Sequence, residues 1–242
     1  MGHSRTGGGS RRQPSRSQRS GTRSAQGKQS LREILGDDLW TFAIPSPSQI
    51  AGVDEAGRGG LAGPVVAAAV ILPAGAVLPG LADSKLLTAS ARSSLAEAIQ
   101  AVAVTWAVAA VQAAEIDATD ILRATLRAMT EAVVNLSPPP GLVLVDGATT
   151  PRLPMPACAV VRGDRRVPVI SAASILAKVA RDRIMEDWAV RFPVYGFAQH
   201  KGYGTVAHRA AIARHGPSPI HRHTFSGVRE HAGDAVPQPR LW

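Results

Sequence analysis

The chain has little cysteine, few aromatic residues and no long apolar run. Of its 242 residues one is cysteine, Cys158, and 4% are aromatic. A single thiol forms no internal disulfide and supports no cysteine-rich zinc site, which excludes disulfide scaffolds and zinc ribbons. No uncharged apolar run reaches the roughly 18 residues of a membrane-spanning helix, and the basic N-terminus lacks the apolar stretch of a secretory signal. We therefore expect a cytoplasmic protein with no membrane partner.

Acidic residues are absent from residues 1–29, which contain seven Lys and Arg. This segment carries most of the formal net charge of +9, because the rest of the chain holds 20 Lys and Arg against 18 Asp and Glu. Its Ser, Gly and Arg composition buries too little apolar surface to offset the entropy of ordering. We predict a disordered basic tail over residues 1–30, which either attracts nucleic acid through counterion release or has no specific role.

Apolar runs of strand length recur through the rest of the chain. They occupy residues 50–54, 65–72, 104–111, 142–146 and 157–161. Helical patterns occupy residues 31–42, 88–101, 122–133, 171–191 and 205–215. The apolar stripe of the third helix consists of Leu122, Leu126, Met129 and Val133. This order predicts one α/β domain over residues 31–228, with a mixed sheet flanked by helices, a helical C-terminal portion and a short tail over residues 229–242.

Acidic residues stand at the ends of three predicted strands. Asp54 and Glu55 close the first strand, Asp146 closes the fourth, and Asp164 follows the fifth after two residues. In open α/β sheets the ligand crevice lies at the carboxyl ends of parallel strands. Adjacent desolvated carboxylates repel each other unless a cation lies between them, and oxygen ligands without His or Cys suit Mg²⁺ or Mn²⁺. The sequence predicts a metal site, the alternative being that Asp146 is a turn residue and Asp164 a loop residue.

A glycine-rich loop directly follows the first two acids. Gly57, Gly59 and Ala62 fit the dinucleotide-binding pattern G-x-G-x-x-A. That pattern requires a helix to follow, whereas residues 65–72 resemble a strand, and the two preceding acids would repel a pyrophosphate. The small residues instead favour close approach of the backbone to a sugar or phosphate, with Arg58 supplying positive charge.

Seven sequence blocks in a fixed order carry a family resemblance. The first two read Gly-Val-Asp-Glu-Ala-Gly-Arg-Gly at residues 52–59 and Leu-Ala-Gly-Pro-Val-Val at 61–66. The others lie at residues 83–85, 145–147, 162–164, 171–179 and 195–203. Together they resemble type 2 ribonuclease H, the ribonuclease HII family, over roughly residues 50–225. Gly60 stands where the family often has proline, and Leu86 stands where a second lysine often follows the Asp-Ser-Lys block.

The resemblance implies a ribonuclease H-like fold and cleavage of the RNA strand of RNA/DNA hybrids. It also implies cleavage 5′ of a single ribonucleotide embedded in duplex DNA, with a 3′-hydroxyl and a 5′-phosphate as products. Two divalent ions, Mn²⁺ or Mg²⁺, roughly 3.5 to 4 Å apart, would activate a water and stabilise the leaving oxygen. The implied partners are these nucleic acid duplexes, and we expect a monomer.

The resemblance further implies roles for individual residues. The catalytic, metal-coordinating acids of the family match Asp54, Glu55, Asp146 and Asp164. The implied substrate-binding residues are Gly57, Arg58, Gly59, Ser84, Lys85, Lys178 and Tyr203. In the family the glycine loop contacts the 2′-hydroxyl, and the tyrosine packs on the neighbouring deoxyribose. A 2′-hydroxyl is both donor and acceptor, so a site that hydrogen-bonds it distinguishes ribose from deoxyribose.

Two other function classes remain alternatives. A non-catalytic nucleic-acid-binding protein needs no acid cluster, and a dinucleotide-dependent oxidoreductase would use the glycine loop without a metal. Cleavage of a ribonucleotide-containing duplex in the presence of magnesium separates both classes from a nuclease.

Several conspicuous residues have simpler explanations than a role in the site. His215, His221 and His223 lack the spacing of a metal site, and we expect them at the surface or facing phosphates. Asp182 follows Lys178 by one helical turn, which favours an ion pair over a further acid of the site. We expect Trp106 and Trp188 in the core.

Overall fold

The computed structural model describes Met1 and residues 46–81 and 87–233. Its centre is a five-stranded sheet with the strand order β3-β2-β1-β4-β5. The strands are β1 (Ile50–Ala56), β2 (Val65–Ile71), β3 (Thr105–Val111), β4 (Leu142–Asp146) and β5 (Ala157–Val160). Strand β2 pairs antiparallel with β1 and β3, whereas β1, β4 and β5 run parallel. The predicted mixed sheet is therefore confirmed.

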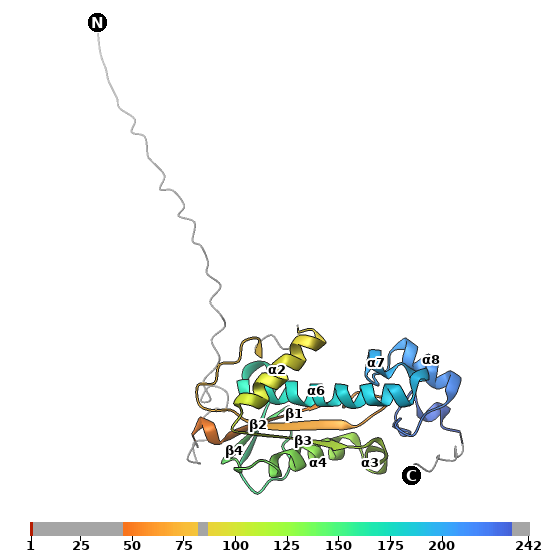
Figure 1. Cartoon of the computed structure of the whole chain (residues 1–242), viewed down its shortest axis with the longest axis horizontal. Helices are drawn as coiled ribbons and strands as arrows, with labels where there is room; N and C mark the ends of the chain where they lie inside the picture. The colour runs from red at the N-terminus through yellow and green to blue at the C-terminus, as the bar shows by residue number, and fades with distance from the viewer. Residues whose placement is uncertain (2–45, 82–86, 234–242) are drawn as a thin grey trace.

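Helices cover both faces of this sheet (Figure 1). They are α2 (Ala89–Val102), α3 (Ala113–Ala118), α4 (Ile121–Val134), α5 (Gly163–Arg166), α6 (Pro168–Arg191), α7 (Phe197–His200) and α8 (Val206–His215). Helices α2 and α6 lie on one face, and α3 and α4 lie on the other. Helices α7 and α8 lie beyond the sheet at the C-terminal end of α6, which confirms the helical C-terminal portion. Short 3-10 turns occupy Pro47–Gln49, Pro193–Tyr195 and Arg229–His231.

The central strands build two hydrophobic cores because their side chains alternate between the faces. Odd-numbered residues of β2 pack with α4, whereas Ala68 and Val70 pack with α2 and α6. At Gly52 in β1, an added Cβ would collide with the backbone of Val169 near the start of α6. The glycine thus permits α6 to lie directly on β1, so that the middle of this helix passes over the carboxyl end of the strand.

The structure confirms most predicted elements and corrects others. Thr88 and Thr205 cap α2 and α8 through their side chains, as expected. Helix α6 begins three residues earlier than predicted, because Pro168 is well suited to the first turn of a helix. Helices α3, α5 and α7 were not predicted, since four to six residues are too few for a helical period to emerge.

Two side-chain placements were wrong. Leu122 is 43% exposed, and the buried stripe of α4 includes Ala124, Ala128 and Ala132, whose small size lets the helix approach the sheet. Trp106 is 40% exposed because it lies on β3, an edge strand. Trp188 is partly buried and stacks on Phe192 with the ring centroids 5.7 Å apart.

Some predictions fall outside the described residues. These are the helix at residues 31–42, nearly all of the basic tail, and the segment with Ser84, Lys85 and Leu86.

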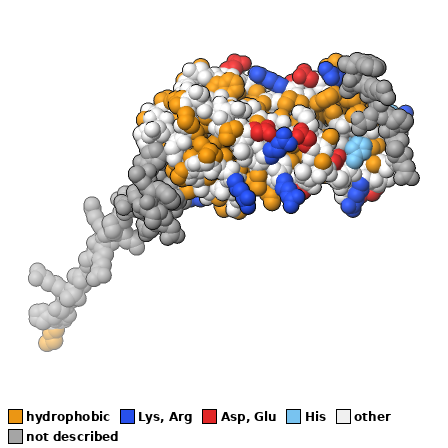
Figure 2. All heavy atoms as spheres, turned by 90° about the horizontal axis from the view of Figure 1, so that it is seen from below, with side chains coloured by type: hydrophobic (Ala, Val, Ile, Leu, Met, Phe, Trp, Pro, Cys, Tyr) orange, Lys and Arg blue, Asp and Glu red, His pale blue; other side chains and the backbone are white. Residues whose placement is uncertain are grey.

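The face of the molecule that is seen from below mixes both signs of charge (Figure 2). In Figure 2, basic side chains project at intervals, with acidic and hydrophobic side chains among them. This mixture agrees with the near balance of charge outside residues 1–29. Among the described helices, none is both long enough and apolar enough to span a bilayer.

Candidate active site

The parallel pairing of β1 with β4 brings two acids side by side. Val53 pairs with Val145, so Asp54 and Asp146 occupy equivalent positions at the carboxyl ends of neighbouring strands. Asp54 is only 5% exposed. The side chain of Ser174, from α6, hydrogen-bonds to its carboxylate. Helix α6 thus lies over the site and supplies a polar partner to Asp54, the most buried of the acids.

Burial and like charge both disfavour ionisation at this edge of the sheet. Burial raises the pKa of Asp54 well above its usual value; the Ser174 hydrogen bond opposes this shift, and the charges of Glu55 and Asp146 add to it. Burial also raises the pKa of Glu55, although Arg58 opposes the shift through an ion pair of 3.4 Å. A cation placed among these carboxylates would reverse both shifts.

Asp164 reaches the same edge from the first turn of α5. Its backbone N–H donates to Asp146 Oδ1 at 3.1 Å, and its carbonyl accepts from the hydroxyl of Ser171 on α6. In the same way, the backbone N–H of Glu55 donates to Asp54 Oδ1 at 2.7 Å. The structure therefore brings all four sequence-predicted acids to one edge of the sheet.

The donor chemistry of this edge suits a divalent cation, although the carboxylates are not gathered on one point. Within the described part of the chain, no three His, Cys, Asp or Glu side chains are grouped to hold an ion. Backbone amides occupy one oxygen each of Asp54 and Asp146. Sharing an ion therefore requires these side chains to turn toward one another. All the available donors are hard oxygens, which is the set that Mg²⁺ and Mn²⁺ prefer.

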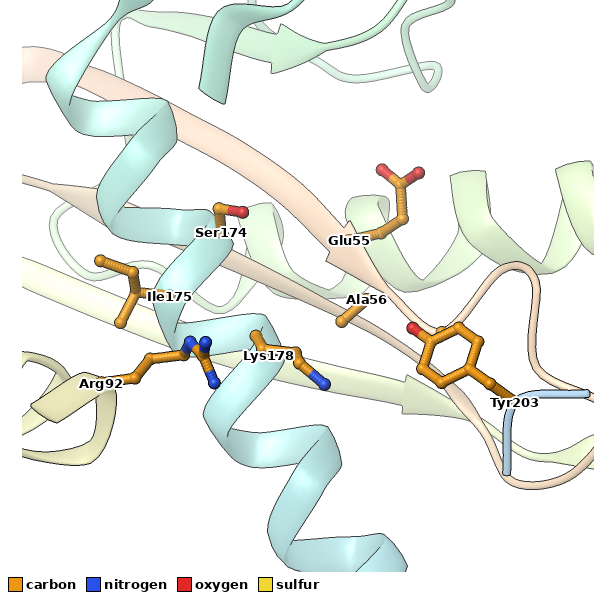
Figure 3. A pocket seen from close by; sticks show the side chains of 8 residues that line it. Glu55, Ala56, Arg92, Ser174, Ile175, Lys178 and Tyr203 are labelled. Atoms are coloured by element: carbon orange, nitrogen blue, oxygen red, sulfur yellow. The ribbon is translucent and has the colours of Figure 1, made fainter. Parts of the chain in front are cut away.

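A cavity of about 330 Å³ opens beside Glu55 (Figure 3). Its lining comes from four parts of the chain: Glu55, Ala56, Gly57, Arg92, Ser174, Ile175, Lys178 and Tyr203. The Lys178 amine points toward the Tyr203 ring, at 5.8 Å from its centroid. Lys178 also forms the predicted ion pair with Asp182, at 2.6 Å. The cavity thus joins an acid, two cationic groups and an aromatic ring.

The sequence analysis did not single out Arg92. It lies in the first turns of α2, four residues after the Thr88 cap, and donates to the carbonyl of Leu87 at 2.9 Å. Its place in the cavity depends on the packing of α2 against α6, which no local pattern records.

Two buried arginines hold the glycine loop between β1 and β2 from behind. Arg222 donates to the carbonyls of Gly57, Arg58 and Gly63, at 2.7, 2.8 and 3.1 Å. Arg181 donates to three further carbonyls, those of Ala62, Pro64 and Lys201. Both arginines are fully buried, and burial lowers the pKa of Arg222 to about 9. The sequence analysis missed both, because their partners lie more than 100 residues away along the chain or in a separate loop.

The first two glycines of the loop have different structural roles. Gly57 has φ +95°, and an added Cβ would collide with the Arg181 side chain. Gly59 is exposed, and a Cβ there would meet no atom within 4 Å. Strand β2 follows the loop without an intervening helix, so the dinucleotide-binding alternative is wrong.

The C-terminal segment fastens Tyr203 to this loop. Gly60 and Tyr203 form an isolated antiparallel bridge, and the N–H of Leu61 donates to the carbonyl of Gly202 at 2.8 Å. The Arg181 guanidinium lies 5.0 Å from the centroid of the Tyr203 ring. Gly60, which departs from the family pattern, therefore lies at the contact between the two segments.

The expectation for His221 was wrong. Its side chain is fully buried, because it hydrogen-bonds to His208 and Ser218 inside the C-terminal portion. His215 and His223 are exposed, as expected.

A mixed sheet with acids at the ends of its parallel strands, beside a cavity that offers cationic and aromatic groups, is the arrangement expected of a nuclease of the ribonuclease H type. The sequence model of the family named Ribonuclease HII matches residues 51–228. Ribonuclease HII of Geobacter metallireducens is 54% identical over 210 residues, which cover 83% of this chain and 99% of that protein. Ribonuclease HII of Albidiferax ferrireducens is 55% identical over 199 residues, which cover 82% and 94%. The chain belongs to the ribonuclease HII family, and it is therefore an endoribonuclease.

Solved structures of related enzymes share the fold. Ribonuclease H2 of Pyrococcus horikoshii matches with a TM-score of 0.64 and 26% identity, over 75% of this chain and 95% of that one. Ribonuclease HII of Archaeoglobus fulgidus, in a complex with PCNA, matches with a TM-score of 0.63 and 26% identity, over 77% and 98%. The predicted ribonuclease H-like fold is confirmed.

Proposed function

We propose that this enzyme cuts the RNA strand of RNA/DNA hybrids and cuts 5′ of single ribonucleotides embedded in duplex DNA, leaving a 3′-hydroxyl and a 5′-phosphate. The observation that carries the proposal is the position of Asp54, Glu55 and Asp146 at one edge of the sheet, directly beside the cavity that contains Tyr203 and Lys178. A protein that only bound nucleic acid would gain nothing from buried acids that repel one another and the phosphates. Family membership independently supports the reaction.

The proposed catalytic groups are Asp54, Glu55, Asp146 and Asp164, which bind two divalent ions, Mg²⁺ or Mn²⁺. When bound, such ions supply an activated water and stabilise the leaving oxygen of an in-line displacement. The raised pKa values of Asp54 and Glu55 support this role, because like-charged buried acids favour a cation. The Ser174 side chain favours the ionised form of Asp54, the form that binds a cation.

The proposed ribose contact is the loop of Gly57, Arg58 and Gly59. The open space beside Gly59 allows a sugar to approach the backbone, and Arg222 fixes the loop from the opposite side. A rigid loop distinguishes ribose from deoxyribose better than a mobile loop, because it must both donate a hydrogen bond to the 2′-hydroxyl and accept one from it. In the same proposal, the Tyr203 ring packs on the deoxyribose that follows the ribonucleotide.

Positive groups of the cavity contact the phosphates in this proposal. Lys178 and Arg92 line it on the side away from the acids, and phosphate contacts fix the register of the duplex. Ser84 and Lys85 complete the expected binding set, and the basic tail adds attraction that does not depend on sequence. The proposed enzyme is a cytoplasmic monomer whose partners are these duplexes.

Cleavage of a labelled duplex with one embedded ribonucleotide tests the proposal. With Mg²⁺ or Mn²⁺ we expect a single cut on the 5′ side of the ribonucleotide, and with a chelator we expect none. An all-DNA duplex of the same sequence is the substrate control and should stay intact. Binding of the ribonucleotide duplex without cleavage in either metal would contradict the proposal.

A further inference from the structure

Two buried histidines form a hydrogen-bonded chain that ends on Tyr203. His208 lies on α8, and both it and His221 are fully buried. The backbone N–H of Ser218 donates to His221 Nδ1 at 2.9 Å. The two Nε2 atoms lie 3.1 Å apart, and His208 Nδ1 lies 2.9 Å from the carbonyl oxygen of Tyr203.

The partners at the two ends fix the direction of every hydrogen bond in this chain. A backbone N–H only donates, so His221 Nδ1 accepts and its proton sits on Nε2. His221 Nε2–H then donates to His208 Nε2, which leaves the proton of His208 on Nδ1. A carbonyl only accepts, so that proton is donated to Tyr203. The chain therefore requires two neutral rings in opposite tautomers.

The surroundings keep both rings neutral. Burial lowers the pKa of His208 to about 4 and that of His221 to about 3. The His200 ring stacks on His208 with the centroids 4.3 Å apart, and the nearby charges of Arg209 and His223 also disfavour protonation. A proton added to His208 would place two donors opposite each other between the Nε2 atoms, and a proton added to His221 would face the N–H of Ser218.

The backbone around Tyr203 is held by the glycine loop on one side, through the Gly60 bridge, and by His208 on the other. Tyr203 lies between Gly202, with φ +80°, and Gly204, in a short loop. Its N–H donates to the carbonyl of His200 at 2.9 Å, and its carbonyl accepts from Thr205 and from His208. The His208 contact ties the Tyr203 carbonyl to a fully buried side chain of α8.

We propose that His208 and His221 are positioning residues for ribonucleotide recognition, which hold the Tyr203 ring in the cavity through its backbone carbonyl. This inference rests on the proposed function, because it takes Tyr203 as the group that contacts the sugar. Neither histidine lines the cavity, so both act through Tyr203.

A matched pair of variants separates this role from packing. Asn and Leu have nearly the same shape, but the amide of His208→Asn can donate to the Tyr203 carbonyl, whereas His208→Leu cannot. Both changes should lower the melting temperature to a similar extent. We expect His208→Leu to lose about tenfold in kcat/KM on a duplex with one embedded ribonucleotide, and His208→Asn to stay within about threefold of the parent. Equal losses for the two variants would overturn the inference.

A double variant tests whether the effect passes through the tyrosine ring. Tyr203→Ala removes the ring and keeps the carbonyl, so adding His208→Leu should cause no further loss of activity while still lowering the melting temperature. Independent, multiplying losses would overturn the inference, as would full activity of Tyr203→Ala on the embedded ribonucleotide. A parent protein that cuts no ribonucleotide-containing substrate would instead refute the proposed function itself.

One measurement needs no variant and so does not depend on the folding of His208→Leu. Long-range ¹H–¹⁵N correlation spectra of the parent at neutral pH should place the proton of His208 on Nδ1 and that of His221 on Nε2. The opposite tautomers, or a charged ring at either position, would overturn the inference.

Discussion

The guanidinium of Arg222 donates to the carbonyl of Gly57 at 2.7 Å, across 165 positions of the chain. Arg222 also donates to the carbonyls of Arg58 and Gly63, and the three hydrogen bonds together hold the glycine loop rigid. The loop meets the candidate metal edge at Glu55 and the candidate ribose site at Gly59. The geometry of both therefore depends on a residue near the end of the described chain.

Arg222→Lys tests this dependence. Lysine keeps the charge but lacks the planar fork that meets three carbonyls at once, so buried carbonyls lose their donors. We expect the free energy of unfolding to fall by about 2 to 4 kcal/mol, measured by urea titration. We also expect activity on the embedded ribonucleotide to fall at a temperature where the variant remains folded. Arg214→Lys, at an exposed position on α8, is the control and should change neither.

Asp54→Asn and Asp146→Asn should each reduce cleavage by at least about a hundredfold, because each removes an ionic ligand from the proposed metal site. In metal-free buffer the melting temperature should hold or rise. The sign follows from the raised pKa of Asp54, since keeping it ionised at neutral pH opposes folding and Asn removes that penalty. A folded variant that cuts at the parent rate would remove that acid from the catalytic set.

Gly57→Ala and Gly59→Ala should separate folding from recognition within one loop. At Gly57 the methyl group collides with Arg181 and the backbone has positive φ, so we expect a fall of several degrees in melting temperature. At Gly59 the methyl group meets open space, so the melting temperature should stay within about one degree. The Gly59 variant should still lose at least about tenfold in kcat/KM on an embedded ribonucleotide if a sugar approaches there. Parent-like cleavage by this variant would contradict the proposed ribose contact.

Protonation of the buried histidines should destabilise the fold in mild acid. Their folded pKa values of about 4 and about 3 lie below the usual 6.5, so the unfolded chain binds more protons between those values. Stability should thus be complete above about pH 6.5 and fall as the pH drops toward 4, by up to about 1.4 kcal/mol per pH unit for each histidine. The raised pKa values of Asp54 and Glu55 act in the opposite direction.

The difference between parent and His221→Gln isolates the histidine contribution, since both carry the same acids. The unfolding free energy of His221→Gln should depend less steeply on pH than that of the parent between about pH 4 and pH 6.5. His215→Gln, at an exposed position, is the control and should follow the parent. Parallel curves for parent and His221→Gln would contradict the prediction.

Deletion of residues 1–29 should weaken binding to duplex nucleic acid and flatten its dependence on salt, because seven cationic side chains are removed. The cleavage position should not move. Binding titrations at several salt concentrations measure both effects, and unchanged affinity at low salt would leave the segment without this role.

Local sequence patterns were sufficient for the five strands and for helices α2, α4, α6 and α8, and they named the four candidate acids. The apolar run Leu142–Asp146 is β4 as predicted, because a buried parallel strand is apolar on both faces. The amino-acid sequence alone places Asp54 and Asp146 at one edge, because the carboxyl ends of parallel strands meet. The prediction placed the wrong face of α4 against the sheet, because it followed the large apolar side chains and gave no weight to the alanines that are in fact buried.

The amino-acid sequence by itself determined the strands and the longer described helices, the family, and the candidate acids and glycines of the site, since each depends on neighbours within a few residues. Only the tertiary structure decided how the glycine loop and Tyr203 are held. Arg181 and Arg222 have partners that are remote in sequence or belong to another loop, His221 has a partner on helix α8, and nothing in the residues beside them predicts those contacts. Hydrogen bonds of this kind exist only once the chain has brought its distant segments together and excluded water from between them.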